Sequence, residues 1–238
     1  MINGLFILGK VRMVENGKIL VSEIFESIDG EGYHAGYPSV FFRVVGCNLR
    51  CSWCDSTYSY IPDENSRWMS VSEAFVEIKK FHIKHITITG GEPLMESNER
   101  WMKDFIALLL ETGYEVDVET NGSIDYEPWK KAFNEKNFHI ISDWKAPSSK
   151  MNKFMFSDNL GILDEKDIIK IVVTDDDFAE VEKILLSGTR AQIYLSPVFN
   201  QVTMSKIPEF VIRHKMFTNL RCQVQLHKIF WEPDKRGV

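Results

Sequence analysis

Segments with the composition of buried β-strands alternate with amphipathic helical segments along most of the chain, and this alternation restricts the possible folds. Runs rich in valine, isoleucine and aromatic residues predict strands at residues 21–28, 40–45, 85–89, 115–119, 138–142, 168–174, 191–196 and 221–226. The i, i+3, i+4 spacing of apolar residues predicts helices that begin near Val71, Trp101 and Phe178. This order is typical of an α/β fold in which helices cover a parallel sheet.

Polar or glycine-rich motifs follow five of the predicted strands, at the points where those strands end. They are Cys47, Gly90-Gly91-Glu92-Pro93, Thr120-Asn121-Gly122, Ser142-Asp143-Trp144-Lys145 and Pro197. Ligands of parallel α/β proteins bind at the carboxyl ends of the strands, which meet at the same edge of the sheet. We therefore expect the five motifs to converge on one binding site.

Three cysteines lie within eight residues, in the segment Cys47-Asn48-Leu49-Arg50-Cys51-Ser52-Trp53-Cys54. Three thiolates on one short loop can hold an iron–sulfur cluster and leave one iron without a protein ligand. Such an iron can bind and activate a small molecule, whereas a cluster held by four cysteines mainly transfers electrons. The spacing therefore favours catalysis.

Structural zinc and a disulfide are the alternatives to a catalytic role for these cysteines. Zinc would require a fourth ligand, for which Cys222 or His34 is available in the sequence. A disulfide on this loop would leave one cysteine unpaired, in a chain without a secretory signal. Cys222 itself lies in an apolar run and is expected to be a buried strand residue.

The Gly90-Gly91-Glu92-Pro93 turn is the second motif with a chemical rationale. Two residues without a Cβ allow the backbone to approach a ligand closely, and Glu92 can accept hydrogen bonds from a cationic amine. Pro93 suits the first turn of a helix. By itself the motif is also typical of an ordinary strand-to-helix turn.

Size and charge indicate one globular domain over residues 1–238 that acts on a small molecule. A hydrophobic content of 44% is enough for a sizeable core. The net charge of −6 and the absence of a basic run argue against direct binding of nucleic acid. No signal peptide or membrane span is evident, so a cytoplasmic location is expected. Residues 1–18 are interpreted as a possible hairpin or extension.

Together, the Cys-x3-Cys-x2-Cys spacing and the Gly-Gly-Glu-Pro motif resemble the radical S-adenosylmethionine superfamily. The resemblance implies a four-iron, four-sulfur (4Fe-4S) cluster whose open iron chelates S-adenosylmethionine. One-electron reduction of the bound cofactor then produces a radical that abstracts hydrogen from the substrate. An electron donor such as flavodoxin or ferredoxin would be required.

Segments 23–32, 42–49 and 225–228 resemble the 7-carboxy-7-deazaguanine synthase family more narrowly. Members of that family contract the ring of 6-carboxy-5,6,7,8-tetrahydropterin with loss of ammonia, on the route to queuosine and other deazapurines. The implied fold is an incomplete, TIM-like barrel of about six parallel strands and three helices. The implied assembly is a homodimer.

The resemblance also assigns roles to residues of this sequence by motif position. Arg43 and Glu31 would be catalytic, Arg43 by holding the substrate carboxylate with its fork of donors. The remaining substrate residues would be Ile28, Asp29, Gly30, Thr89 and Pro233. The residues around S-adenosylmethionine would be Trp53, Cys54, Asp55, Gly91, Glu92, Ser142, Lys145, Ser196, Pro197, Val198 and Phe199. The cluster ligands would be Cys47, Cys51 and Cys54.

The family also uses Mg²⁺, held partly by a hydroxyl two residues after the last cluster cysteine, which here is Ser56. Two residues depart from the family pattern. Serine stands at position 56 where threonine is common, and Asp29 replaces a frequent glutamine. A carboxylate only accepts hydrogen bonds, whereas an amide also donates them, so contacts to the pterin would be rearranged.

Two other functions fit part of the sequence. A glycyl-radical-enzyme activase shares the chain size and the cysteine spacing, but its protein substrate requires an open groove rather than the carboxylate clamp expected at Arg43. An iron–sulfur electron carrier or zinc-binding module would not consume S-adenosylmethionine. The histidines at 82, 85 and 139 have no carboxylate or cysteine close in sequence that suggests a metal site, and packing or surface roles are expected for them.

Overall fold

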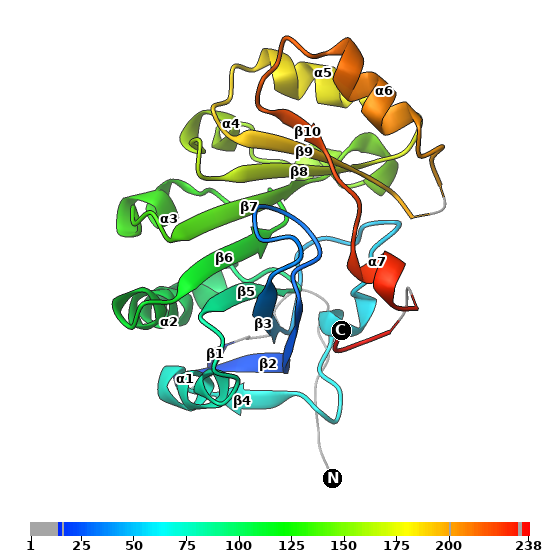
Figure 1. Ribbon diagram of the computed structural model, residues 1–238. Helices are drawn as coiled ribbons and strands as arrows, with labels where there is room; N and C mark the ends of the chain where they lie inside the picture. Colours follow the sequence, from blue (N-terminus) through cyan, green and yellow to red (C-terminus); the bar gives the residue numbers. More distant parts are fainter. Residues whose placement is uncertain (1–13, 16, 200, 233–234) are drawn as a thin grey trace.

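The computed structural model describes residues 14–15, 17–199, 201–232 and 235–238 (Figure 1). Within these ranges, ten strands form one sheet in the order β1-β2-β3-β5-β6-β7-β8-β9-β10, with β4 paired to β2. The strands are β1 Val14–Glu15, β2 Lys18–Ile28, β3 Pro38–Val44, β4 Arg67–Met69, β5 His85–Gly90, β6 Glu115–Thr120, β7 Phe138–Trp144, β8 Ile168–Val173, β9 Gln192–Pro197 and β10 Leu220–Cys222. The helices are α1 Val71–Lys79, α2 Glu99–Glu111, α3 Glu127–Ala132, α4 Asn159–Ile162, α5 Phe178–Leu186, α6 Lys206–Arg213 and α7 His227–Phe230.

The sheet is parallel from β3 to β10 and remains open. Each neighbouring pair in the series β3-β5-β6-β7-β8-β9-β10 is parallel, whereas β1, β3 and β4 pair antiparallel with β2. The predicted fold, an incomplete barrel of parallel strands covered by helices, is confirmed. In the described part of the chain seven strands run parallel instead of about six, and the shorter helices α3, α4, α6 and α7 add to the three expected.

Alternate residues of the parallel strands face two different environments. Ile86 and Ile88 of β5, like Val116 of β6, belong to the main apolar core together with Trp101 and Phe105 of α2. The residues between them are polar, and on the other face His85 bonds to Asp117, Thr89 to Glu119 and Thr87 to Asp29 of the β2–β3 loop. They are His85, Thr87 and Thr89 of β5 and Asp117 and Glu119 of β6. Because successive side chains of a strand point to opposite faces, the sheet has an apolar face that packs against the helices and a polar inner face.

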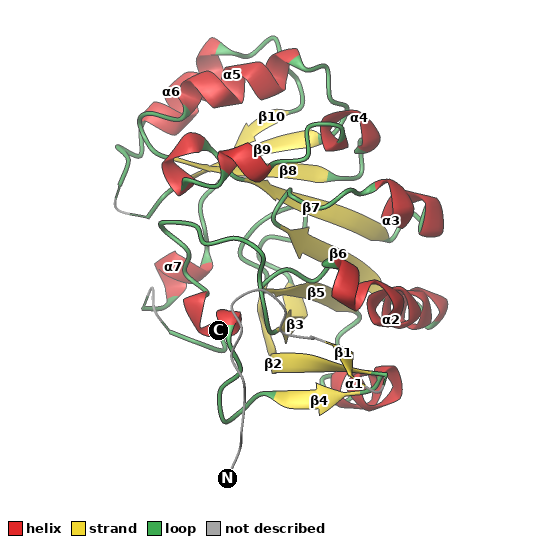
Figure 2. Cartoon of the chain, turned by 180° about the vertical axis from the view of Figure 1, so that it is seen from behind, coloured by secondary structure: helices red, strands yellow, loops and turns green. Residues whose placement is uncertain are grey.

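Helices α2 and α3 lie on a different side of the molecule from the C-terminal segment (Figures 1 and 2). In both views α2 and α3 lie at one side and α7 lies at the other, close to the end of the chain (Figures 1 and 2).

Among the described residues, no helix is long and apolar enough to cross a membrane.

The last predicted strand is shorter than expected. The sequence predicts β structure for residues 221–226, but β10 ends at Cys222. Cys222 is exposed, so the prediction that it is buried is wrong. After Cys222 the chain turns inward, because Gln223 and Gln225 approach Glu31 (3.4 Å each) and the backbone N–H of Leu226 donates to Gly30 O (3.1 Å). A tertiary contact therefore replaces strand pairing.

At the amino end, part of the segment expected to form a hairpin is described. Strand β1 pairs antiparallel with the start of β2, with Val14 opposite Ile19 and Glu15 opposite Lys18. Gly17 lies at the turn with φ +74°, a left-handed conformation that glycine adopts readily. The rest of that segment, residues 1–13 and 16, lies outside the described residues.

Helix α1 begins with the capping box that the sequence predicts. Ser70 Oγ accepts from the Glu73 N–H (3.3 Å), and the Glu73 carboxylate accepts from the Ser70 N–H (2.7 Å). We expect Ser70→Ala to lower the free energy of unfolding by about 1 kcal/mol, because the Glu73 N–H at the helix start loses its acceptor. Chemical denaturation measures the change. Ser72→Ala, in the same turn, should change stability by less than about 0.5 kcal/mol; an equal loss in both variants would contradict the cap.

Candidate functional site

A cavity of about 440 Å³ opens at the carboxyl ends of the strands. The motifs that follow β3, β5, β6 and β7 contribute to its lining, as expected from the sequence, whereas after β9 the lining residues are Val198 and Phe199 and not Pro197. The predicted site residues that line it are Ile28, Asp29, Gly30, Glu31, Arg43, Cys47, Cys51, Trp53, Cys54, Asp55, Ser56, Thr89, Gly91, Lys145, Val198 and Phe199. The structure thus brings most of the predicted residues to one cavity.

The three clustered cysteines are free thiols, partly buried, that line this cavity together. Cys47 Sγ accepts from the Leu49 N–H (3.4 Å) and from Asn121 Nδ2 (3.7 Å). Burial raises the pKa of Cys47 above its usual range and raises the pKa of Cys51 to about 11. Bound iron would supply the positive charge that keeps such thiols ionised, so the donor set fits a three-cysteine cluster.

The proposed fourth ligands of a zinc site do not lie at this cavity. Cys222 is exposed at the end of β10, and His34 hydrogen-bonds to Asp117 (2.8 Å). Neither residue is part of the lining. Neither Cys222 nor His34 is therefore placed to complete a tetrahedral zinc site with these cysteines.

The two glycines of Gly90-Gly91-Glu92-Pro93 pack against the backbone that leads into the cysteine loop. A Cβ at Gly91 would lie 1.7 Å from Gly46 O, and one at Gly90 would lie 2.3 Å from Val44 O. The Gly91 and Glu92 N–H groups donate to Val44 O (3.1 Å) and Gly46 O (2.8 Å), respectively. The missing side chains thus allow β5 and the cysteine loop to approach each other, in addition to leaving space for a ligand.

Glu92 occupies a different position from the one expected. Its side chain is fully buried and does not line the cavity. Its carboxylate accepts hydrogen bonds from the N–H groups of Leu94 (2.9 Å) and Asn121 (2.7 Å) and from Thr120 Oγ1 (2.8 Å). Burial raises the pKa of Glu92 to about 7. As a correction, Glu92 in this structure joins the turn after β5 to the end of β6 and is not presented to a ligand.

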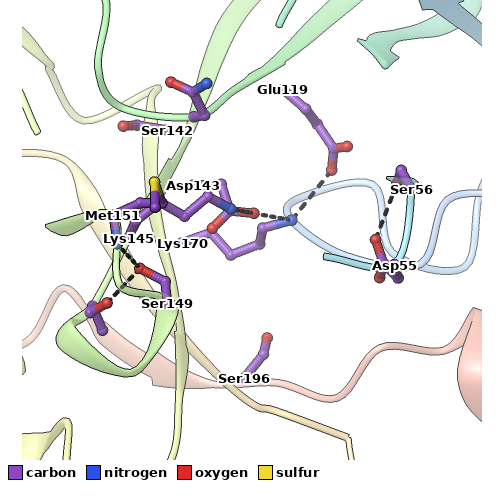
Figure 3. A network of polar contacts seen from close by, with 12 residues as sticks. Asp55, Ser56, Glu119, Ser142, Asp143, Lys145, Ser149, Met151, Lys170 and Ser196 are labelled. Atoms are coloured by element: carbon purple, nitrogen blue, oxygen red, sulfur yellow. Dashed lines mark hydrogen bonds and ion pairs between the residues drawn. The ribbon is translucent and has the colours of Figure 1, made fainter. Parts of the chain in front are cut away.

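Lys170 of β8 is the centre of a buried ionic network in the cavity. Its Nζ lies 2.8 Å from Glu31 Oε2, 3.6 Å from Glu119 Oε1 and 3.5 Å from Asp143 Oδ2. Figure 3 shows the lysine side chain between Glu119 and Asp143. Burial alone would lower the pKa of Lys170, but the three carboxylates raise it well above the usual range, so the ammonium stays charged.

Sequence reasoning missed Lys170 and Glu119, although a signal for both was present. Lys170 interrupts the apolar strand Ile168-Ile169-Lys170-Ile171-Val172-Val173, and Glu119 ends the alternation Glu115-Val116-Asp117-Val118-Glu119. A charge inside a buried strand is costly unless an opposite charge lies nearby. This cost is the signal that would have identified both residues.

A second group of charges surrounds the cysteine loop. Lys145 pairs with Asp143 (2.8 Å) and lies over the Trp53 ring, 5.2 Å from its centroid. Asp55 pairs with Lys228 of α7 (2.9 Å) and accepts from Ser56 Oγ (3.0 Å). Burial would raise the pKa of Asp55, but Lys228 and the hydrogen bonds lower it below its usual range. These residues hold fixed charges beside the cysteines.

Arg43 reaches the cavity from β3 with one donor already engaged. Its Nε donates to Glu23 Oε1 (2.8 Å), which also accepts from Tyr58 Oη (3.0 Å). Within the described ranges, neither terminal nitrogen of the guanidinium has an acceptor at hydrogen-bond distance. A buried guanidinium oriented through Nε can offer both terminal nitrogens to a ligand carboxylate.

The loop after β2 carries the other expected substrate residues. Asp29 is buried and accepts hydrogen bonds from Thr87 Oγ1 (2.9 Å) and the Glu31 N–H (3.2 Å). Burial, and then the nearby Glu119 and Asp117 carboxylates, raise the pKa of Asp29 to about 7. Near neutral pH a protonated Asp29 can therefore donate a hydrogen bond, as the amide common at this position does.

A few predicted residues do not line the cavity. Ser142 is buried behind it and accepts from Tyr126 Oη (2.9 Å), and Ser196 donates to Glu31 (3.3 Å). Pro197 lies on a separate, smaller pocket near α7. Pro233 lies outside the described residues, although Lys235, Arg236, Gly237 and Val238 beyond it line the cavity.

We expect Gly91→Ala to disrupt the cysteine loop, because the new Cβ would collide with a backbone oxygen that cannot move independently. Overpacking of this kind should lower the free energy of unfolding by about 3 kcal/mol. Iron bound after anaerobic reconstitution, measured by inductively coupled plasma mass spectrometry, should fall with it. Gly161→Ala in α4, where a Cβ meets no atom within 4 Å, is the matched control and should retain both. Normal iron loading in Gly91→Ala would contradict this packing.

Comparisons with known proteins agree with this geometry. Residues 42–159 match the family model described as the radical SAM superfamily. The 7-carboxy-7-deazaguanine synthase of Clostridium acetobutylicum is 37% identical over 92% of this chain and 98% of that protein. The enzyme of the same name from Aquifex aeolicus is 35% identical over 93% of this chain and 97% of its own length.

Among solved structures, QueE from Escherichia coli has the same fold, with a TM-score of 0.66 and 21% identity over 87% of this chain and 94% of the other. The matches to these curated proteins cover more than nine-tenths of the chain. The chain therefore belongs to the radical S-adenosylmethionine superfamily and, within it, to the 7-carboxy-7-deazaguanine synthase family.

Proposed function

We propose that the protein converts 6-carboxy-5,6,7,8-tetrahydropterin to 7-carboxy-7-deazaguanine with loss of ammonia, as a radical S-adenosylmethionine lyase. The observation that carries the proposal is one cavity lined both by the cysteine loop and by the buried guanidinium of Arg43. A radical source and a carboxylate-binding cation at the same cavity suit a small carboxylated substrate. Membership of the family supports the same reaction.

Cys47, Cys51 and Cys54 would hold the cluster, and the adjacent lining residues would surround S-adenosylmethionine. Together these two groups, when bound, supply the species that abstracts hydrogen from the substrate. The protein residues would position it: Trp53 and Lys145 form a cation–π pair beside the cysteines, and Val198 and Phe199 provide apolar lining. Excluding water from such a site prevents side reactions.

Arg43, Lys170 and Glu119 would position the substrate. The two terminal nitrogens of Arg43 suit a bidentate contact to its carboxylate. Lys170 stays protonated among its three carboxylates and contributes a fixed positive charge and N–H donors. Thr89 Oγ1 donates to Glu119 Oε2 (2.9 Å), which holds that carboxylate in the cavity as a hydrogen-bond acceptor.

Ser56 is the protein residue that would contact Mg²⁺. It lines the cavity beside Asp55, whose lowered pKa keeps a negative charge there. Magnesium retains most of its water ligands and uses few protein oxygens, so one hydroxyl together with substrate oxygens fits its chemistry.

The activase and the electron carrier or zinc module are less compatible with the cavity. An activase must admit a protein segment, whereas residues 235–238 line the cavity from the C-terminal side. An electron carrier or zinc module has no use for a buried ammonium among three carboxylates next to Arg43. The expected flavodoxin or ferredoxin donor and the homodimer rest on the resemblance to the family, and the cytoplasmic location is an expectation from the sequence.

An anaerobic assay of the reconstituted protein with S-adenosylmethionine, reductant and the carboxylated tetrahydropterin should yield the deazaguanine acid, identified by mass spectrometry. Added Mg²⁺ should increase the rate, and Ser56→Ala should weaken the dependence on Mg²⁺ because one ligand is lost. Consumption of S-adenosylmethionine without deazaguanine would overturn the substrate but retain the superfamily chemistry. No consumption under reduction would overturn the enzymatic proposal.

Arg43→Lys should lower kcat/KM for the pterin by about 100-fold, because an ammonium cannot reproduce a bidentate contact made from a fixed orientation. Iron loading and the uncoupled, substrate-free cleavage of S-adenosylmethionine should stay close to wild type. Arg100→Lys, which changes an arginine of α2 outside the cavity lining, is the control for the substitution itself. An unchanged kcat/KM in Arg43→Lys would rule out the proposed clamp.

A further inference from the structure

A cluster of metal-binding side chains lies apart from the reaction cavity, at the other end of the polar interior. It consists of His34 from the β2–β3 loop, His85 at the start of β5 and Asp117 in the middle of β6. One potential ligand atom from each residue lies within 4.8 Å of the other two. None of the three residues lines the reaction cavity.

The two imidazoles converge on a single carboxylate oxygen. Asp117 Oδ2 lies 2.8 Å from His34 Nδ1 and 3.1 Å from His85 Nε2. Ligand atoms that share an ion with bonds of about 2.0–2.2 Å lie about 3.0–3.4 Å apart in octahedral or tetrahedral geometry. The two separations from Asp117 Oδ2 lie within a few tenths of an ångström of that range, and all three ligand atoms lie within 4.8 Å of one another.

Hydrogen bonding within the trio leaves two buried polar atoms unmatched. Asp117 Oδ1 and His85 Nδ1 are inaccessible to solvent and have no partner among the described residues. Asp117 is 1% exposed, and both imidazoles share its other oxygen. A buried carboxylate with one unpartnered oxygen is an unusual arrangement for a purely structural hydrogen-bond network.

Neighbouring groups provide an outer layer and an entrance. The second nitrogen of His34, Nε2, lies 3.8 Å from Glu115 Oε1, which also contacts His139 Nε2 at 2.8 Å. A carboxylate behind an imidazole is the usual way of orienting a metal-bound histidine. The His34 side chain is 21% exposed and that of Glu115 is 38% exposed, so an ion can reach the trio from their side.

We propose that His34, His85 and Asp117 bind one divalent transition-metal ion, Zn²⁺ being the best match to two imidazoles and a carboxylate. The ion would fix the β2–β3 loop against β5 and β6. Figure 1 shows this loop crossing in front of the sheet near β6 and β7. This site is separate from the cysteine loop and from the magnesium position proposed at Ser56.

The loop gives the ion a connection to the reaction cavity. Asp29, Gly30 and Glu31 line the cavity at the start of the loop, and His34 lies further along the same loop. Backbone hydrogen bonds join the two ends of the loop, from the Gly36 N–H to Asp29 O (2.8 Å) and from the Asp29 N–H to Tyr37 O (2.7 Å). Fixing His34 would therefore restrict the position of the Asp29 side of the cavity.

The test uses the full chain with its cluster reconstituted anaerobically, so that the cysteines are occupied by iron. After equilibration with Zn²⁺ and a competing chelator, mass spectrometry of the metals should find about one zinc per chain in addition to iron. Bound zinc should also raise Tm. His34→Gln and His85→Gln should each weaken zinc binding at least about tenfold and abolish the Tm shift.

His139→Gln is the matched control, because His139 lies next to the trio but outside the ligand set. The affinity of this variant for zinc should stay within about tenfold of the wild-type affinity. Three results would overturn the site: no zinc binding, the same zinc affinity in His34→Gln as in wild type, or zinc binding only as iron is lost. The trio would then be a histidine–aspartate hydrogen-bond network. Because metal content is measured without turnover, this result does not depend on the proposed reaction.

Discussion

The burial of charge inside an open barrel is the constraint on which the rest of this structure depends. Parallel strands place every second side chain on the inner face, and here many of those side chains are ionisable. Lys170 is acceptable there because three carboxylates surround it, and removing the lysine would leave Glu31 and Glu119 without the cation that they share. The network is thus both the framework of the interior and the polar surface offered to a ligand.

The same constraint explains why residues distant in sequence act together. Glu31 comes from the loop after β2, Glu119 from β6 and Asp143 from β7, yet all three approach the ammonium of β8. The segment after β10 completes the arrangement, since Gln223 and Gln225 approach Glu31. The end of the chain therefore contributes to the cavity through polar contacts rather than through a further strand.

Close backbone approach is the second requirement of the site. The turn after β5 contacts the backbone of residues 44–46 so tightly that a Cβ at Gly91 has no space. Glu92 then secures this turn to the end of β6 through two hydrogen bonds, from Thr120 and Asn121. The cysteine loop is held in place by this packing, which explains why glycine and glutamate are needed at these two positions even without a ligand contact.

The interior also connects the two ends of the barrel. The loop after β2 contributes Asp29 and Glu31 to the cavity and His34 to the histidine–aspartate trio at the opposite end. Since backbone hydrogen bonds close this loop, a displacement at one end would be transmitted over a short rigid segment. The inner face therefore links the proposed substrate loop to the proposed metal-dependent anchor.

The sequence by itself determined the alternation of strands and helices, the edge at which the motifs meet, and the cysteine loop, because these follow from local periodicity and spacing. Tertiary structure decided the rest. It assigned Glu92 to the framework, exposed Cys222, and joined His85 to Asp117 and His34, partners 32 and 51 residues away that no local pattern reveals. The physical reason is that charge compensation and close packing depend on which residues meet in space, and these pairings are not encoded in neighbouring positions.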